Sequence, residues 1–293
     1  MTATTAPLTA TDLARLERRQ ARRERWRLLR RRPGFLIGSF ISLVWVVCAI
    51  GGEAITPYNP YATEFTPNLR PESAHPFGTD NLGRDVLSRV MAGARDVLIV
   101  APLAAIISVI AGTLLGLSAA YLRGLLDESI SRVMEAVLSI PLVMIGLLVL
   151  TTLGSTAPVL IFTVALLFTP IVFRTVRAST LAEAELDYVT SARLRGENVL
   201  FTMTREILPN ISGPIIVETT VRVGYAIFTI ATLQFLIGGA DPASPAWGTQ
   251  VSQMYTYISG GTWWPTLFPA LALASLVIAV NLIADSVEAV YSS

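Results

Sequence analysis

The chain has 293 residues, of which 53% are hydrophobic and only 15% are charged, and its formal net charge is +1. Soluble domains carry roughly 25% charged residues, so the composition excludes an ordinary soluble domain and indicates an integral membrane protein. The sequence contains no Lys, which excludes a P-loop ATP site in this chain because the P-loop Lys must reach the β- and γ-phosphates.

A basic arm occupies residues 1–34, with ten Arg between Arg15 and Arg32. Good helix formers fill this stretch, which predicts a helix. Its function is either to lie on anionic membrane lipid or only to orient the chain. No nucleic-acid partner is expected, because lipid headgroups are the nearest polyanion to an arm tethered to the membrane. The length of the basic region and the lack of a small-x-small cleavage site argue against a cleaved signal peptide.

Six apolar runs are long enough to be candidates for crossing a hydrocarbon core of about 30 Å. They are approximately Phe35 to Ile55, Val97 to Tyr121, Ala136 to Leu153, Ala157 to Phe173, Ile211 to Ile237 and Pro265 to Ala284. The third and fourth are separated only by small residues and a proline, which predict a tight turn. The sequence therefore predicts an all-α, polytopic membrane protein with six transmembrane helices.

The arginines predict the orientation of these spans. The connection from Arg174 to Arg205 carries five Arg, whereas the loop from Gly238 to Trp264 carries none. Positive residues stay inside, so the arm, the Arg174–Arg205 connection and both termini are expected on the cytoplasmic side. The loop over residues 56–96, in which acids outnumber four Arg, is expected outside.

The single cysteine and the single histidine limit metal chemistry. Cys48 lies in an apolar run and can form neither an intrachain disulfide nor a Cys-based metal site. His75 has no second ligand nearby and is expected to be an ordinary loop residue. No metal and no cofactor are expected on this chain. A membrane-embedded hydrolase is not expected either, because paired catalytic groups at membrane depth are missing.

A helical apolar stripe is predicted just before the second span. The stripe consists of Leu82, Val86, Leu87, Val90 and Met91, and the opposite side carries Arg84, Asp85, Ser88 and Arg89. A helix at the outer membrane surface fits this pattern. Two interpretations stay open: a landing surface for a substrate-delivery protein, or a structural brace of paired charges.

A two-helix knob is predicted on the cytoplasmic side, over residues 178–210. Gly196 lies where a first short helix needs a left-handed C-cap. Apolar residues then recur at helical spacing, at Val199, Leu200, Met203, Ile207 and Leu208, and Pro209 ends that register. An ordinary amphipathic hairpin at the membrane interface would show the same periodicity.

Glu218 and Arg222 are charged residues within the fifth apolar run. At i, i+4 spacing they can neutralise each other while facing a polar translocation pathway. The alternative is that both lie near the cytoplasmic interface and extend towards it.

The knob resembles the cytoplasmic EAA loop of ABC-importer permeases. Ala192, Gly196, Leu208 and Pro209 match that motif at its spacing, whereas Thr190, Ser191 and Glu206 replace its usual Glu, Ala and Ile. The resemblance implies an ATPase-coupling role for Thr190, Ser191, Ala192, Arg193, Arg195, Gly196, Glu197, Leu208 and Pro209.

Other stretches resemble the C-type subunit of dipeptide, oligopeptide and nickel importers. The stretch from His75 to Arg89 carries the most specific likeness, and its motif residues are Gly78, Thr79, Asp80, Gly83, Arg84 and Asp85. Ala246-Trp247-Gly248 and the region from Trp263 to Asn281 are also similar. The resemblance covers about three quarters of the chain.

This resemblance implies a type I ABC-importer permease over residues 35–293 that does no bond chemistry itself. The implied partners are a homologous second permease, two ATPase domains that bind ATP and Mg, and an extracytoplasmic solute-binding protein. The implied substrates are oligopeptides or dipeptides, with nickel or another small solute as the alternative. An ATP-independent channel or secondary carrier is the remaining rival.

Overall fold

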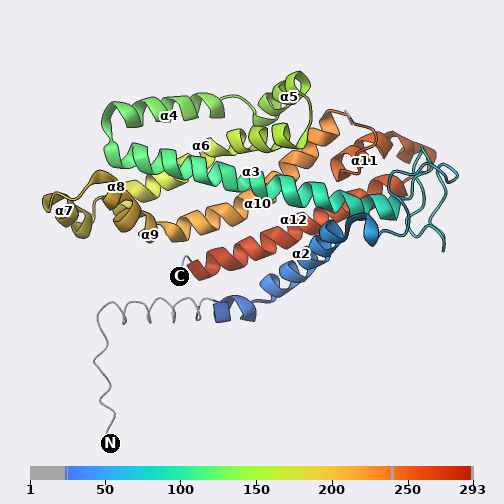
Figure 1. The fold of residues 1–293 in the computed structure, drawn as a ribbon, viewed down its shortest axis with the longest axis horizontal. Coiled ribbons are helices and arrows are strands. Elements are labelled where there is room, and N and C mark those ends of the chain that lie inside the picture. The colour runs from blue at the N-terminus through green and yellow to red at the C-terminus, as the bar shows by residue number, and fades with distance from the viewer. Residues whose placement is uncertain (1–23, 25, 239–240, 292–293) are drawn as a thin grey trace, which may run out of the picture.

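A computed structural model describes residues 24, 26–238 and 241–291 of the protein (Figure 1). Most of the predicted helix of the basic arm lies outside the described residues, and its described end, residues 26–31, is helical. Within the described part, helices dominate and the only β-type pairing is an isolated bridge between Thr79 and Asp85. The predicted all-α membrane fold is confirmed.

The longer helices follow the apolar runs of the sequence, except the helix over residues 124–138, which carries four charged residues. They are α2 (Pro33–Gly51), α3 (Val86–Leu122), α4 (Gly124–Leu138), α5 (Leu142–Leu153), α6 (Ala157–Glu183), α10 (Ser212–Leu236) and α12 (Trp264–Tyr291). Short helical segments connect them: η1 (Gly52–Ala54), α7 (Asp187–Leu194), α8 (Val199–Phe201), a π-helix η2 (Thr202–Ile207), α9 (Leu208–Asn210), α11 (Trp247–Met254) and η3 (Tyr255–Gly260).

Five of the described helical segments are long and apolar enough to cross a membrane: α2 with η1, α3, α6, α10 and α12. The prediction of one continuous span from Ala136 to Leu153 is wrong, because α4 and α5 meet there at an angle of 82°. α5 has 12 residues and is only about 18 Å long, too short to cross the core alone. The protein has six spans if the bent pair counts as one.

The α4–α5 break lies at a proline. Ser139 closes α4, and Pro141 is the N-cap of α5 with an extended ψ of 124°. Proline disfavours the helical conformation of the residue before it, so one straight helix cannot continue through Ile140. The apolar run concealed this break because none of its residues is charged.

The closest helix pair, α3 with α6, depends on glycine. A Cβ atom on Gly112 would lie 2.6 Å from the Val172 Cβ, and one on Gly116 would lie 2.9 Å from the Phe173 oxygen. These two glycines form a G-x-x-x-G pattern, which lets helix backbones approach closely within a membrane. Val172 belongs to a buried cluster shared with Val109 and Leu117 of α3, and the larger cluster of the same helix pair is completed by α10 and α12.

Two ends of the molecule carry the irregular segments (Figure 1). The loop before α3 and α11 lie at one end, and α7, α8 and α9 lie at the other. α3 joins the two ends: its 37 residues span about 55 Å at a rise of about 1.5 Å per residue. The second span was predicted to begin at Val97, but the helix already begins at Val86.

Candidate functional site

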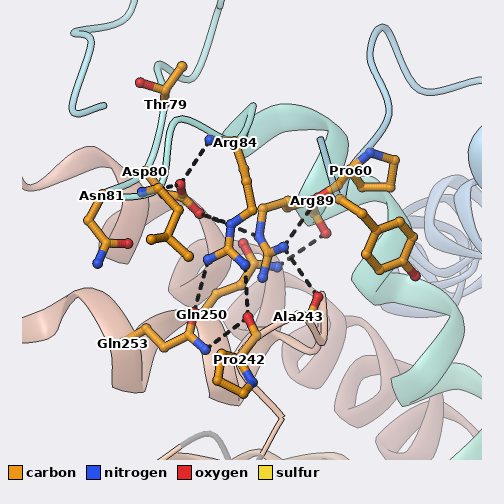
Figure 2. Close-up of polar contacts among 12 residues, drawn as sticks. Pro60, Thr79, Asp80, Asn81, Arg84, Arg89, Pro242, Ala243, Gln250 and Gln253 are labelled. Atoms are coloured by element: carbon orange, nitrogen blue, oxygen red, sulfur yellow. Dashed lines mark hydrogen bonds and ion pairs between the residues drawn. The ribbon is translucent and has the colours of Figure 1, made fainter. Parts of the chain in front are cut away.

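A buried charge network holds the end of the molecule that carries α11 (Figure 2). The Arg84 guanidinium donates to the Asp80 carboxylate at 2.6 Å, to the Pro242 carbonyl at 2.8 Å and to the Gln253 side chain at 3.1 Å. Arg84 is only 3% exposed. Asp80 also accepts from the backbone N–H of Arg84 at 2.9 Å. The pair therefore ties the turn before α3 to the loop before α11 and to α11 itself.

Arg89 binds the same loop from the first turns of α3. Its guanidinium donates to the carbonyls of Ser244 at 2.7 Å, Pro60 at 3.2 Å and Ala243 at 3.4 Å, and it is 1% exposed. Buried carbonyls need donors, and the five-donor fork of Arg supplies several from one residue. We name Asp80, Arg84 and Arg89, with the carbonyls that they bind, the brace.

Asp85 positions the start of α3 beside the brace. It is the N-cap residue, and its carboxylate accepts from the backbone N–H and the hydroxyl of Ser88. Its other oxygen lies 2.8 Å from Nδ1 of His75. The expectation that His75 is an ordinary loop residue is wrong in part, because the ring is buried and paired.

The remaining motif residues shape the turn that precedes α3. Gly78 and Gly83 have φ values of +71° and +72°, which favour glycine, and a Cβ on either would overlap backbone oxygens of the same loop. The Thr79 hydroxyl donates to the Thr66 carbonyl at 2.7 Å, and the Thr79 carbonyl accepts from the indole N–H of Trp264 at 3.0 Å. The motif thus encodes a fixed turn.

This arrangement corrects the prediction of a separate surface helix. Leu82 precedes the helix, and the helix continues directly into the membrane span. Arg84, Asp85, Ser88 and Arg89 were expected on an exposed side, yet all four are buried. These side chains cannot receive a docking protein directly, so the geometry supports the structural brace.

The knob projects from the opposite end, and its first helix ends as predicted (Figure 1). Gly196 has φ +74°, its N–H bonds the Arg193 carbonyl at 3.0 Å, and the Glu197 N–H bonds the Ala192 carbonyl at 3.2 Å. These two bonds form a Schellman C-cap after α7. Nothing lies within 4 Å of a Cβ built on Gly196, so the tip is open.

The knob divides into an inner face and an outer tip. Val189, Met203 and Ile207 are buried in a cluster shared with α3 and α6, and Ala192 is buried as well. The outer tip exposes Thr190, Ser191, Arg193, Leu194 and Arg195, and Leu194 is 84% exposed. Arg195 pairs with Glu197 at 2.6 Å, and the Arg193 guanidinium lies 4.7 Å from the centre of the Tyr121 ring on α3.

The predicted second helix of the knob differs in detail from the structure. Its middle is the π-helix η2, and Val199 and Leu200 are exposed, whereas Met203 and Ile207 are buried. The widened turn of a π-helix shifts side chains around the axis, so the i, i+4 stripe does not stay on one face. Leu208 and Pro209 begin α9 directly after it.

A clamp that the sequence analysis did not predict lies at the base of the knob. The Tyr188 hydroxyl donates to Glu183 at 2.6 Å, on the last residue of α6, and accepts from the Asn210 side chain at 2.9 Å. Burial, together with the Glu183 bond, raises the pKa of Tyr188 to about 12. The clamp therefore joins the segment that enters the knob after α6 to the segment that leaves it at α9.

Glu218 and Arg222 form the ion pair that their spacing predicts. The Arg222 Nε lies 2.7 Å from a Glu218 oxygen, and the side chains are 11% and 12% exposed, respectively. The guanidinium also lies 5.6 Å from the centre of the Phe168 ring and 5.0 Å from that of Tyr225. Two aromatic rings thus flank Arg222, and the role of the pair in a translocation pathway stays a prediction.

Replacing Arg222 with Ala leaves the Glu218 carboxylate unpaired at a costly depth, so we expect uptake to fall about tenfold. Glu218→Gln in the same chain should restore part of it, because the unpaired charge is removed. Uptake and membrane abundance are measured for the single and double variants. Unchanged uptake in both single variants would show that the pair has no part in transport.

No cluster of three or more potential metal ligands occurs among the described residues. The comparisons with known proteins identify the family of the chain. Residues 112–292 match the family described as "Binding-protein-dependent transport system inner membrane component", and residues 21–76 match "N-terminal TM domain of oligopeptide transport permease C".

Three curated relatives are similar over almost the whole chain. A "putative peptide transport system permease protein" of Brucella suis biovar 1 is 38% identical, covering 89% of this chain and 88% of its own. The "dipeptide transport system permease protein" of Escherichia coli K12 is 35% identical, covering 90% of each chain. The "glutathione transport system permease protein" of Pectobacterium atrosepticum is 33% identical, covering 91% and 89%.

Proposed function

This chain belongs to the family of binding-protein-dependent transport system inner membrane components, the membrane permeases of ABC importers, and from that premise we propose that it moves short peptides across the cytoplasmic membrane. The similarity to peptide permeases carries the proposal: relatives named for peptide, dipeptide and glutathione transport are 33% to 38% identical over nearly their full length. These names favour a peptide substrate over nickel.

We further propose that partner chains complete the importer. The knob offers an exposed tip of Arg193, Leu194 and Arg195 to an ATPase, and this chain, lacking Lys, has no P-loop of its own. ATP and Mg then belong to two ATPase domains. A homologous second permease closes the pathway, and an extracytoplasmic binding protein delivers peptide at the brace end.

Alternating access would follow from movement of the knob. Val189 and Ile207 pack in one cluster with Val109 and Val172, on α3 and α6. A knob attached in this way moves with those helices when ATPase domains close, which is the rigid-body mode of many transporters. Glu218 and Arg222, on α10, are the candidates for the pathway lining.

The test of this function is uptake by the purified complex in proteoliposomes. Labelled trialanine should accumulate only with ATP on the knob side and the binding protein on the other. Accumulation without ATP would support a secondary carrier. Failure to move any peptide, with ATP hydrolysis stimulated by another solute, would overturn the peptide assignment.

The orientation is tested by cysteine labelling in a Cys48→Ser chain. Single cysteines at Ser73 and Ser259, both exposed at the brace end, should react with an impermeant thiol reagent added to intact cells. A cysteine at Ser191, exposed on the knob, should react only after lysis. Labelling of the Ser191 position in sealed cells would reverse the proposed topology.

A further inference from the structure

A cavity of about 240 Å³ opens between α3, the α5–α6 turn, the end of α10 and α11. Asp96 on α3, Gln234 on α10 and Thr249 on α11 line it, and Asp241 lies at the loop that follows α10. The Glu218–Arg222 pair does not line this cavity, and the brace reaches it only through Ser244.

Three hydrogen-bond acceptors that line the cavity have no donor among the described residues. The Asp96 carboxylate is partly buried and makes no hydrogen bond or ion pair there. The Gln234 Oε1 atom is fully buried and unpartnered. Thr249 is only 5% exposed, and its hydroxyl likewise bonds to no described group. These three acceptors belong to residues on three different helices that line one cavity, so a single ligand in the cavity would contact all three helices.

The charged residues that line the cavity indicate the chemistry of its ligand. Its lining includes two carboxylates, Asp96 and Asp241, and no Arg or His among the described residues. One Asp241 oxygen already accepts from the Ala243 backbone at 3.0 Å, whereas neither Asp96 oxygen accepts a hydrogen bond from a described residue. A ligand that carries a positive charge and several hydrogen-bond donors satisfies all three acceptors at once.

We infer that this cavity binds a primary ammonium group of the transported peptide. An ammonium group has three N–H donors and no acceptor, which matches the Asp96 carboxylate, the Gln234 oxygen and the Thr249 hydroxyl. Drug-sized ligands occupy roughly 300–1,000 Å³, so 240 Å³ admits the end of a peptide or one side chain rather than a whole oligopeptide. The inference rests on the proposed peptide function and adds recognition of the charged amine.

The test compares peptides that differ only in their amines, with saturating binding protein whose affinity for each is measured separately. Asp96→Asn should lower ATP-driven uptake of trialanine about tenfold, because it removes the charge of the hydrogen-bonded carboxylate. It should leave uptake of N-acetyl-trialanine unchanged. Thr249→Val, which keeps the side-chain shape, should lower trialanine uptake about threefold. Glu64→Gln, an exposed acid on the loop before α3, is the matched control and should change neither rate.

A third peptide, N-acetyl-Ala-Lys-Ala, distinguishes the two sources of the amine. Its uptake should respond to Asp96→Asn if a Lys side chain enters the cavity, and it should not if only the α-amino group does. Equal losses for trialanine and N-acetyl-trialanine would show a structural role, and no loss for either amine source would show that the cavity is not used. Either result overturns the inference. The proposed peptide function still stands in both cases, because the wild-type complex takes up the peptide.

Absence of uptake in the wild-type complex would instead refute the peptide function. A binding measurement then decides the cavity separately: trialanine should raise the thermal midpoint of the wild-type complex and not that of Asp96→Asn. Equal shifts in the two proteins, or no shift in either, would overturn the inference.

Discussion

Gly196→Trp is expected to abolish most ATPase coupling, lowering peptide-stimulated ATP hydrolysis at least tenfold, while the chain stays in the membrane. The left-handed backbone at φ +74° disfavours any Cβ by about 1–2 kcal/mol. No neighbour lies within 4 Å of that Cβ, so the indole would project from the open tip into the space of a docking partner. Membrane abundance, co-purified ATPase and ATP turnover are measured.

Gly196→Asn is the matched control, because Asn tolerates the left-handed region and adds little bulk. It should keep most of the coupling. Thr190→Ala should also do little, since the exposed Thr190 side chain makes no hydrogen bond with the described residues. Normal turnover and normal ATPase recovery in Gly196→Trp would show that the knob is only an interfacial hairpin.

Arg84→Met is expected to lower the thermal midpoint of the protein in detergent by about 10 °C. The substitution removes the 2.6 Å partner of the buried Asp80 carboxylate, which keeps only Arg89, at 3.8 Å, as a charged partner. The Pro242 carbonyl loses its 2.8 Å donor and keeps only the longer bond from the Gln253 side chain at 3.2 Å. Removing one partner of a buried ion pair costs about 3–5 kcal/mol, and each kcal/mol shifts the midpoint by about 2–4 °C in a protein of roughly this size.

Adding Asp80→Asn to Arg84→Met should recover part of the loss, because it removes the charge that has lost its closest partner. Arg95→Met, an exposed arginine on the same helix, is the control and should shift the midpoint little. A midpoint within 2 °C of the wild type in Arg84→Met, on the scale of about 2–4 °C per kcal/mol, would show that the brace contributes little stability.

The class of the fold was predictable because lipid imposes a simple rule on composition: a span needs a long uncharged run. The same rule missed the break between α4 and α5, since an uncharged Ser139-Ile140-Pro141 stretch has the hydropathy of a continuous span. It also placed the start of the second span too late. The first turns of α3 carry Arg89, which hydropathy treats as exposed although the fold buries it.

The local part of each site was more predictable than its distant contacts. The C-cap at Gly196 depends on neighbours within the same turn, so spacing alone found it. The partners of Arg84 and Arg89 are backbone carbonyls 158 and 154 residues away, at Pro242 and Ala243, and a carbonyl has no sequence signature. The charges of the stretch therefore suggested an exposed face. The Tyr188 clamp was missed for the same reason.

The length of α3 has a mechanical consequence. Its first turns are fastened to the brace through Arg89, and its last turn touches the knob through the contact of Tyr121 with Arg193. A rod of about 55 Å acts as a lever: a tilt of about 5° about one end displaces the other by about 5 Å. Pro102 is the one proline within this helix, and proline removes a backbone hydrogen bond and allows a bend. A displacement of the knob end of α3 is therefore transmitted in full to the brace end only while the helix stays straight at Pro102.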